Sequence, residues 1–249
     1  LSSPSWLDQT AWPFVPREFV HADGSLHYID EGDGPLLVLV HGTPTWSFEW
    51  RHVIGALQQQ HRILALDHLG FGLSHRPRTA GYSPEHHARR FAAWFAHVVG
   101  DTPYDIVVHD FGGPIALPTV LDKSGTCRRL VITNSWGWDL GRDPALRRQI
   151  NLVQGTVGRW LYRYLNASQR LLMPNAYGDG ARLTSAIHRQ YLAPFADADS
   201  RERVLFALAR SLKASATFFD QIHHRAEELR ALDVHLVWGM KDGILPPSV

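Results

Sequence analysis

Asp110 is the residue whose neighbours point most directly to covalent chemistry. It ends the apolar run Ile106-Val-Val-His-Asp110, which predicts a buried strand, and Gly112, Gly113 and Pro114 follow it. A strand, a tight turn and a helix in this order form the kind of turn that presents a nucleophile, and a helix N-terminus favours a carboxylate. Asp110 is therefore a candidate nucleophile, and the simpler alternative is that its side chain caps the helix.

Two further polar loops follow predicted strands. The segment His41-Gly-Thr-Pro-Thr-Trp-Ser47 follows the run Leu36–Val40, and its backbone N–H groups can point across to the aspartate. The segment Asp67-His-Leu-Gly-Phe-Gly-Leu-Ser74 follows the next strand. A carboxylate beside fixed N–H donors can attack an electrophilic carbon and form an ester on the enzyme.

Signatures of several other chemistries are absent from the sequence. It contains no G-x-x-x-x-G-K-[ST], no G-x-G-x-x-G after a strand, no H-E-x-x-H and no G-x-S-x-G. The pairs His86-His87 and His223-His224 point about 100° apart on a helix, which makes joint ligation of one metal awkward. We interpret them as surface or capping histidines and expect neither a metal nor an organic cofactor.

The elements that must position these residues alternate along the chain. Strands are predicted at five apolar runs, which are Leu36–Val40, Ile63–Leu66, Ile106–Val108, Leu130–Thr133 and Val234–Trp238. Continuous apolar runs of this kind are typical of parallel strands that are buried on both faces. Helices are predicted at Glu85–Val99 and Pro114–Leu121, and the stretch Trp136–Ser215 contains helix-like segments and no strand candidate. We expect that stretch to lie over the carboxyl ends of the sheet, with a separate helical domain as the alternative.

Composition excludes several classes of partner. The 249 residues include 25 Lys+Arg and 24 Asp+Glu, and the formal charge of +1 argues against a nucleic-acid partner or an anionic membrane surface. No apolar run approaches the roughly 18 residues that span a bilayer. The single cysteine, Cys127, excludes an internal disulfide and suits a reducing compartment, so we expect a cytoplasmic protein. The 9 Trp and 11 Phe suit a small apolar substrate, and they suit a large core equally well.

The ordered set of motifs resembles one superfamily. His41-Gly-x-Pro, Asp67-His-x-Gly-x-Gly-x-Ser and His109-Asp-x-Gly-Gly together resemble the α/β-hydrolases, and within them the haloalkane dehalogenase and epoxide hydrolase branch that uses Asp in place of Ser. The resemblance runs from about Asp23 to Pro247. It implies an α/β-hydrolase core over residues 1–135, a helical cap over 136–215 and a continued core over 216–249, with a C-terminal strand and helix missing.

The resemblance also implies a mechanism, and haloalkane dehalogenase is the closer of the two activities. Asp110 would displace a leaving group from an sp³ carbon, and water would hydrolyse the resulting alkyl ester. The backbone N–H groups of Thr43 and Phe111 would hold the oxyanion, and Asp242 would orient the base histidine. Asp242 follows the strand Val234–Trp238. Some relatives carry this acid after an earlier strand, where this chain has Asn134. The structural alternative for Asp242 is that it only forms a local turn before Gly243.

Two features depart from the family pattern, and the first concerns the leaving group. Dehalogenases hold the halide with side-chain N–H donors at positions that are Phe111 and Thr43 here, and neither side chain has an N–H group. Tryptophans of the helical cap could supply the missing N–H donors only weakly, and the candidates are Trp136, Trp138 and Trp160. The departure keeps epoxide hydrolysis open, with Tyr177 and Tyr191 as possible proton donors from the lid.

The second departure concerns the general base. In the family the base histidine follows a further strand beyond the acid, whereas all 15 histidines of this chain precede Asp242. We therefore expect either a fragment of a longer protein or a catalytically incomplete relative. The alternative outside the enzymes is a non-catalytic ligand-binding or interaction protein with the same fold.

Overall fold

The structure is a computed structural model that describes residues 4–247, apart from the side chain of Ala145, so the outer limits of the segments 1–135 and 216–249 lie outside the described residues. Seven strands form one sheet in the order β1-β2-β4-β3-β5-β6-β7. They are β1 (Arg17–His21), β2 (Gly24–Glu31), β3 (Leu36–Val40), β4 (Arg62–Leu66), β5 (Tyr104–Asp110), β6 (Cys127–Ser135) and β7 (Asp233–Val237). The strands from β4 to β7 pair in parallel, whereas β2 pairs with β1 and β4 in antiparallel fashion.

The predicted strands are all present, and two strands were missed. All five residues of β3 are buried, and four of the five residues of β4 are, which explains their unbroken apolar sequence. The hairpin β1–β2 was missed because β1 lies at the edge of the sheet and both strands mix polar residues with apolar ones. Its signal was the Ala22-Asp23 turn, followed by the short apolar and aromatic run that contains Leu26, Tyr28 and Ile29.

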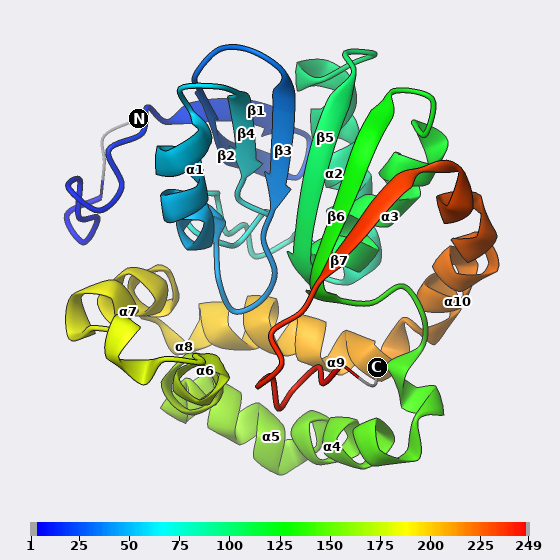
Figure 1. Ribbon diagram of the computed structural model, residues 1–249. Helices are drawn as coiled ribbons and strands as arrows, with labels where there is room; N and C mark the ends of the chain where they lie inside the picture. The colour runs from blue at the N-terminus through cyan, green and yellow to red at the C-terminus, as the bar shows by residue number, and fades with distance from the viewer. Residues whose placement is uncertain (1–3, 248–249) are drawn as a thin grey trace.

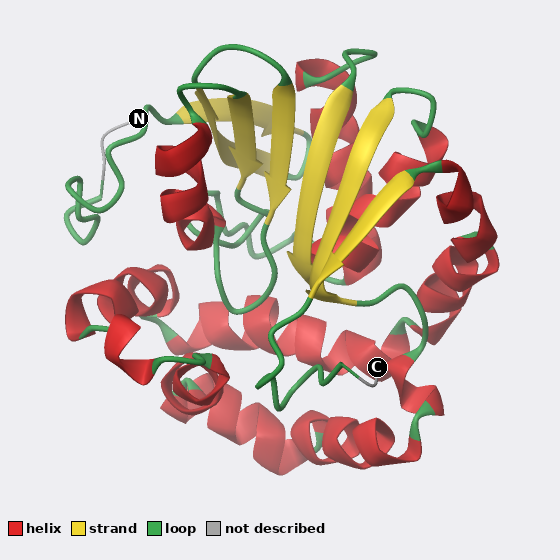
Figure 2. Ribbon diagram, in the orientation of Figure 1, coloured by secondary structure: helices red, strands yellow, loops and turns green. Residues whose placement is uncertain are grey.

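Helices cover both faces of the sheet and its carboxyl edge. Figure 1 shows α1 in front of the strands and α2 and α3 behind them. The helices between β6 and α10 lie across the carboxyl ends of the strands, as Figure 2 also shows. The helices are α1 (Arg51–Leu57), α2 (Pro84–Val98), α3 (Gly112–Asp122), α4 (Pro144–Gln154), α5 (Thr156–Trp160), α6 (Met173–Ala176), α7 (Ser185–Leu192), α8 (Ala198–Ser200), α9 (Ala207–Ala214) and α10 (Ala216–His224).

The sheet order creates a crevice beside β3. The chain passes from β3 to β4 on one side, and the next strand, β5, is added on the other side of β3. Ligands of open α/β sheets bind where the strand order reverses in this way. Val40 pairs with Val108, so the residues that follow these two strands leave the sheet side by side.

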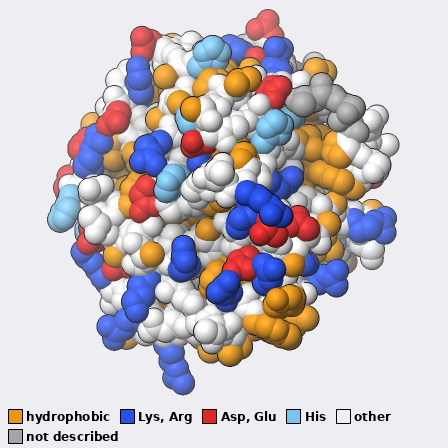
Figure 3. Space-filling view, turned by 180° about the vertical axis from the view of Figure 1, so that it is seen from behind, with side chains coloured by type: hydrophobic (Ala, Val, Ile, Leu, Met, Phe, Trp, Pro, Cys, Tyr) orange, Lys and Arg blue, Asp and Glu red, His pale blue; other side chains and the backbone are white. Residues whose placement is uncertain are grey.

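The face of the molecule in Figure 3 carries charges of both signs. Basic and acidic side chains are interspersed on it. Within residues 4–247, no helix is long and apolar enough to cross a membrane.

The interpretation of the His86-His87 pair as surface or capping residues is wrong for His87. Its side chain is almost fully buried on the inner face of α2, among the rings of His68, Phe71 and Tyr82. His86 is half-buried and meets the Ser83 hydroxyl at 2.7 Å, at the start of the helix. Adjacent helix positions point about 100° apart, so one residue of the pair faces the core and its neighbour does not.

Candidate active site

Asp110 sits in a strained turn between β5 and α3. Its φ of 50° lies in the left-handed region that non-glycine residues rarely adopt. Its Oδ1 accepts a hydrogen bond of 2.7 Å from the backbone N–H of Thr43, in the loop after β3. Its carbonyl oxygen accepts a hydrogen bond of 2.6 Å from the Ser135 hydroxyl at the end of β6. The loop after β3, as its motif predicts, and the last residue of β6, which no motif marked, therefore fix the aspartate.

Glycines let the backbone approach this turn. A Cβ atom on Gly42 would lie 2.3 Å from the Asp110 Cβ, and one on Gly113 would lie 1.9 Å from the Ser135 Oγ. A Cβ on Gly112 would lie 2.5 Å from the carbonyl oxygen of Val40. Contacts this short do not occur in folded proteins, so these three positions require glycine.

Replacing Gly42 should disturb Asp110 more than the fold as a whole. We expect Gly42→Ala to push the Thr43 N–H away from Asp110, because the new methyl group competes with the aspartate side chain for space. The expected loss is about 10²-fold in the rate at which Asp110 reacts and about 1–3 kcal/mol in the free energy of unfolding. Single-turnover kinetics and urea unfolding measure the two effects. Gly55→Ala, where a Cβ meets nothing within 4 Å, is the matched control.

Asp110 opens into a cavity between the sheet and the overlying helices. The cavity has a volume of about 940 Å³, and its lining is predominantly apolar, with Trp136, Leu140, Ile150, Met173 and Leu205 among the residues. A cavity of this size suits a small apolar molecule. In the part of the chain that the structure describes, no group of three or more His, Cys, Asp or Glu side chains is arranged to hold a metal ion.

Burial and neighbouring groups shift the pKa values of Asp110 and His109 in opposite directions. Burial raises the pKa of the Asp110 carboxyl to about 6, while His109 and the N–H groups of Thr43 and Phe111 act in the lowering direction. Burial alone would lower the pKa of His109, but Glu49, Asp110 and Asp242 together raise it to about 9. At neutral pH the carboxylate of Asp110 therefore lies beside an imidazolium.

Comparison with known proteins identifies the family. A family model described as alpha/beta hydrolase fold matches residues 35–249. Haloalkane dehalogenase 2 of Mycobacterium tuberculosis (strain ATCC 25618 / H37Rv) is 32% identical over 241 residues, which are 97% of this chain and 83% of that relative. The chain belongs to the haloalkane dehalogenase branch of the α/β-hydrolase superfamily.

Other similar proteins carry different names or show the fold alone. Cis-3-alkyl-4-alkyloxetan-2-one decarboxylase of Xanthomonas campestris pv. campestris is 27% identical over 93% of this chain and 81% of that relative. The crystal structure of a loop variant of haloalkane dehalogenase DbeA from Bradyrhizobium elkanii superposes with a TM-score of 0.79 at 19% identity, over 94% of this chain and 83% of that one. At that identity the likeness shows the fold.

Asp242 and Asn134, the two places where the resemblance puts the orienting acid, lie in contact. The Nδ2 of Asn134 donates a hydrogen bond of 2.7 Å to Oδ2 of Asp242. The Oδ1 of Asp242 accepts from the backbone N–H groups of Ile244 and Leu245 at 2.8 and 3.0 Å. Asp242 thus makes the local turn that was the alternative to its role as the orienting acid, and it also lines the cavity.

The aromatic residues predicted to bind halide or donate a proton differ in whether they line the cavity. Trp136, Tyr177 and Tyr191 line the cavity, whereas Trp138 and Trp160 are not among its lining residues in the described chain, and Trp160 is 52% exposed. Phe111 also lines the cavity and packs edge-on against Trp136 at 4.8 Å between ring centroids. The halide candidates on the cap therefore reduce to Trp136.

Two histidines line the cavity, and one of them has a partner that the sequence did not reveal. They are His52 and His109, and His109 contacts Glu49, whose carboxylate oxygens lie 3.2 and 3.3 Å from Nδ1 of the ring. Within residues 4–247, no histidine hydrogen-bonds to Asp110 or Asp242. No motif marked Glu49, because its partner is 60 residues away in sequence.

Proposed function

We propose that this chain cleaves carbon–halogen bonds of small haloalkanes through a covalent ester on Asp110. One observation carries the proposal: a carboxylate in a strained turn, fixed by the Thr43 N–H, opens into a largely apolar cavity. A charged nucleophile that faces an apolar cavity is poorly hydrated and reacts readily with an apolar electrophile. The dehalogenase relative supports the choice of leaving group.

The proposed first step is an in-line displacement at carbon. A carboxylate oxygen of Asp110 forms a bond to the sp³ carbon, the carbon–halogen bond breaks, and the halide leaves with the bonding electron pair. In the second step water attacks the ester carbonyl, and the N–H groups of Thr43 and Phe111 stabilise the oxyanion. Alcohol and one proton are then released and the carboxylate is regenerated.

Two unpaired donors near Asp110 support a site for the departing halide. The indole N–H of Trp136 and the hydroxyl of Thr43 are buried and find no hydrogen-bond partner among the described residues. Both residues line the cavity that holds Asp110. Buried donors without partners are costly, and a halide can accept hydrogen bonds from both.

Epoxide hydrolysis is the second candidate, and the tyrosines favour it. Tyr177 and Tyr191 both line the cavity, and burial raises the pKa of the Tyr191 hydroxyl well above its ordinary value. Arg51 also donates to the Tyr191 hydroxyl at 3.3 Å. A phenol at this place can protonate an alkoxide that stays on the substrate.

Product analysis separates the candidates. The chain is incubated with a 1-bromoalkane, the matching 1,2-epoxyalkane and a cis-3,4-dialkyl oxetan-2-one, the last because of the name of the decarboxylase relative. We expect a burst of one equivalent of bromide per chain and then slow turnover, because no histidine in the described chain hydrogen-bonds to Asp110 or Asp242 to activate water for the second step. The other two compounds should not react. A diol from the epoxide, or an alkene and CO₂ from the oxetanone, without bromide release, would overturn the dehalogenase proposal.

A further inference from the structure

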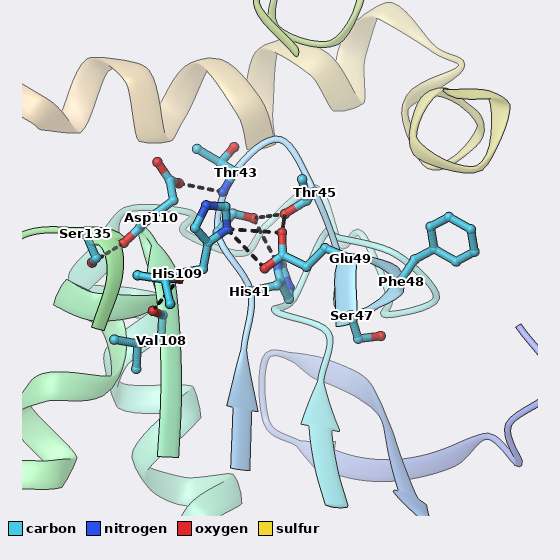
Figure 4. A network of polar contacts seen from close by, with 12 residues as sticks. His41, Thr43, Thr45, Ser47, Phe48, Glu49, Val108, His109, Asp110 and Ser135 are labelled. Atoms are coloured by element: carbon cyan, nitrogen blue, oxygen red, sulfur yellow. Dashed lines mark hydrogen bonds and ion pairs between the residues drawn. The ribbon is translucent and has the colours of Figure 1, made fainter. Parts of the chain in front are cut away.

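Glu49, His109 and Thr45 form a polar cluster in the cavity wall beside Asp110. Thr45 donates its hydroxyl to Oε2 of Glu49, and both oxygens of that carboxylate face Nδ1 of His109. Figure 4 shows the His109 ring between Asp110 and Glu49. The three residues come from the loop after β3, the short helix η1 (Ser47–Trp50) and the end of β5. All three line the cavity.

The charges that act on His109 come from every side of the cluster. Glu49, Asp110 and Asp242 are carboxylates, and the fourth titratable neighbour is the buried His41. The Glu49 side chain is 11% exposed and the His109 side chain is 37% exposed, so water screens this pair only in part. The ring of Trp50 meets that of His109 edge-on at 6.3 Å between centroids and adds no charge. Because these carboxylates raise the pKa of His109 to about 9, its protonated form is favoured at neutral pH, and a protonated imidazole does not take a proton from water.

We propose that Glu49 holds His109 as a fixed cation that keeps the neighbouring Asp110 ionised within the cavity. His109 is then a positioning residue for the nucleophile and takes part in no proton transfer. Burial disfavours a charged carboxylate, and an opposite charge within about 4–6 Å offsets this by roughly 1–3 pKa units. Without the cation, Asp110 would be largely protonated near neutral pH, and a carboxylic acid is a poor nucleophile. The inference extends the proposed function, which requires Asp110 as a carboxylate.

The first test measures the ionisation of Asp110 directly and needs no substrate. The carboxyl carbon of Asp110 is followed by ¹³C NMR against pH in aspartate-labelled protein, with Asp110→Asn used for assignment. We expect a midpoint of about 6 in the wild type, and one higher by about 1 unit or more in His109→Gln. His109→Lys, which restores a positive charge, should bring the midpoint back down. An unchanged midpoint in a folded His109→Gln variant overturns the proposal.

The second test leaves His109 in place and removes its partner. In Glu49→Gln, the imidazole of His109 should titrate well below the wild-type value of about 9, toward its ordinary 6.5. Glu228→Gln, which removes a surface carboxylate paired with Arg225, is the matched control and should leave the His109 titration unchanged. A His109 titration unaffected by Glu49→Gln contradicts the role of Glu49.

The two proposals fail in distinguishable ways. If Asp110 is the nucleophile, the pH profile of its alkylation should follow its NMR titration and move upward in His109→Gln by the same amount. If no alkyl adduct forms but the Asp110 midpoint still moves, the haloalkane proposal is wrong and the role of His109 stands. If the adduct forms and the midpoint stays fixed, the role of His109 is wrong and the nucleophile stands.

Discussion

Asp110→Asn should form no covalent adduct with a 1-haloalkane, whereas the wild-type chain should gain the mass of one alkyl group. The amide keeps the shape of the side chain but lacks the charge that attacks carbon. Loss of a nucleophile of this kind costs between about 10⁴- and 10⁶-fold in rate. Intact-mass spectrometry measures the adduct, and peptide mapping locates it. We expect the ester to accumulate in the wild type, because no histidine in the described chain hydrogen-bonds to Asp110 or Asp242.

A surface aspartate and the stability of the variant control this experiment. Asp122→Asn, at the other end of α3, breaks only an ion pair with Arg225 and should alkylate as the wild type does. Asp110→Asn should also be more stable than the wild type above pH 6, because the raised pKa of Asp110 means that ionisation disfavours the folded state. We expect about 1–3 kcal/mol, which should vanish below about pH 4. An adduct on folded Asp110→Asn would show that another residue is the nucleophile.

The parallel half of the fold could be predicted from the sequence because its strands are buried on both faces. A strand such as β3 must be apolar at every position, and that run is visible without any knowledge of its neighbours. The edge hairpin β1–β2 could not be read in this way, because solvent accepts polar residues on its outer side. Asp110 could be found because a strained turn imposes glycines on the residues that follow it.

The parts of the site that were missed depend on contacts between distant segments. Glu49 reaches His109 because the loop after β3 turns back into η1 beside the end of β5. Asn134 and Asp242, which are 108 residues apart, meet because β6 and β7 are neighbours. The sequence offered these two as alternatives for one role, and the structure shows that they are partners. Side-chain pairs of this kind follow from the packing of loops and leave no local pattern.

His87→Leu should make the protein much less sensitive to acid. Both ring nitrogens of His87 are buried without a hydrogen-bond partner, and burial, followed by Arg90, His41 and His86, holds the pKa of the ring well below its ordinary 6.5. The pKa of the neighbouring His68 is lowered well below 6.5 in the same way, with His87 among the causes. In the unfolded chain both rings take up a proton near pH 6.5, whereas in the folded protein they stay neutral.

Acid therefore favours the unfolded state, because only the unfolded chain binds protons at these two histidines. The free energy of unfolding is unaffected by them above about pH 7 and falls progressively as the pH drops below 6.5. Each histidine that stays neutral adds a slope of up to about 1.4 kcal/mol per pH unit. His87→Leu should remove about half of the combined slope between pH 6 and 5, and the free energy of unfolding in urea at each pH measures it. His223→Leu, at an exposed site on α10, should leave the slope as in the wild type. Equal slopes for wild type and His87→Leu would contradict the prediction. They would mean that His87 takes up its proton in the folded protein despite its packing against His68 and Phe71.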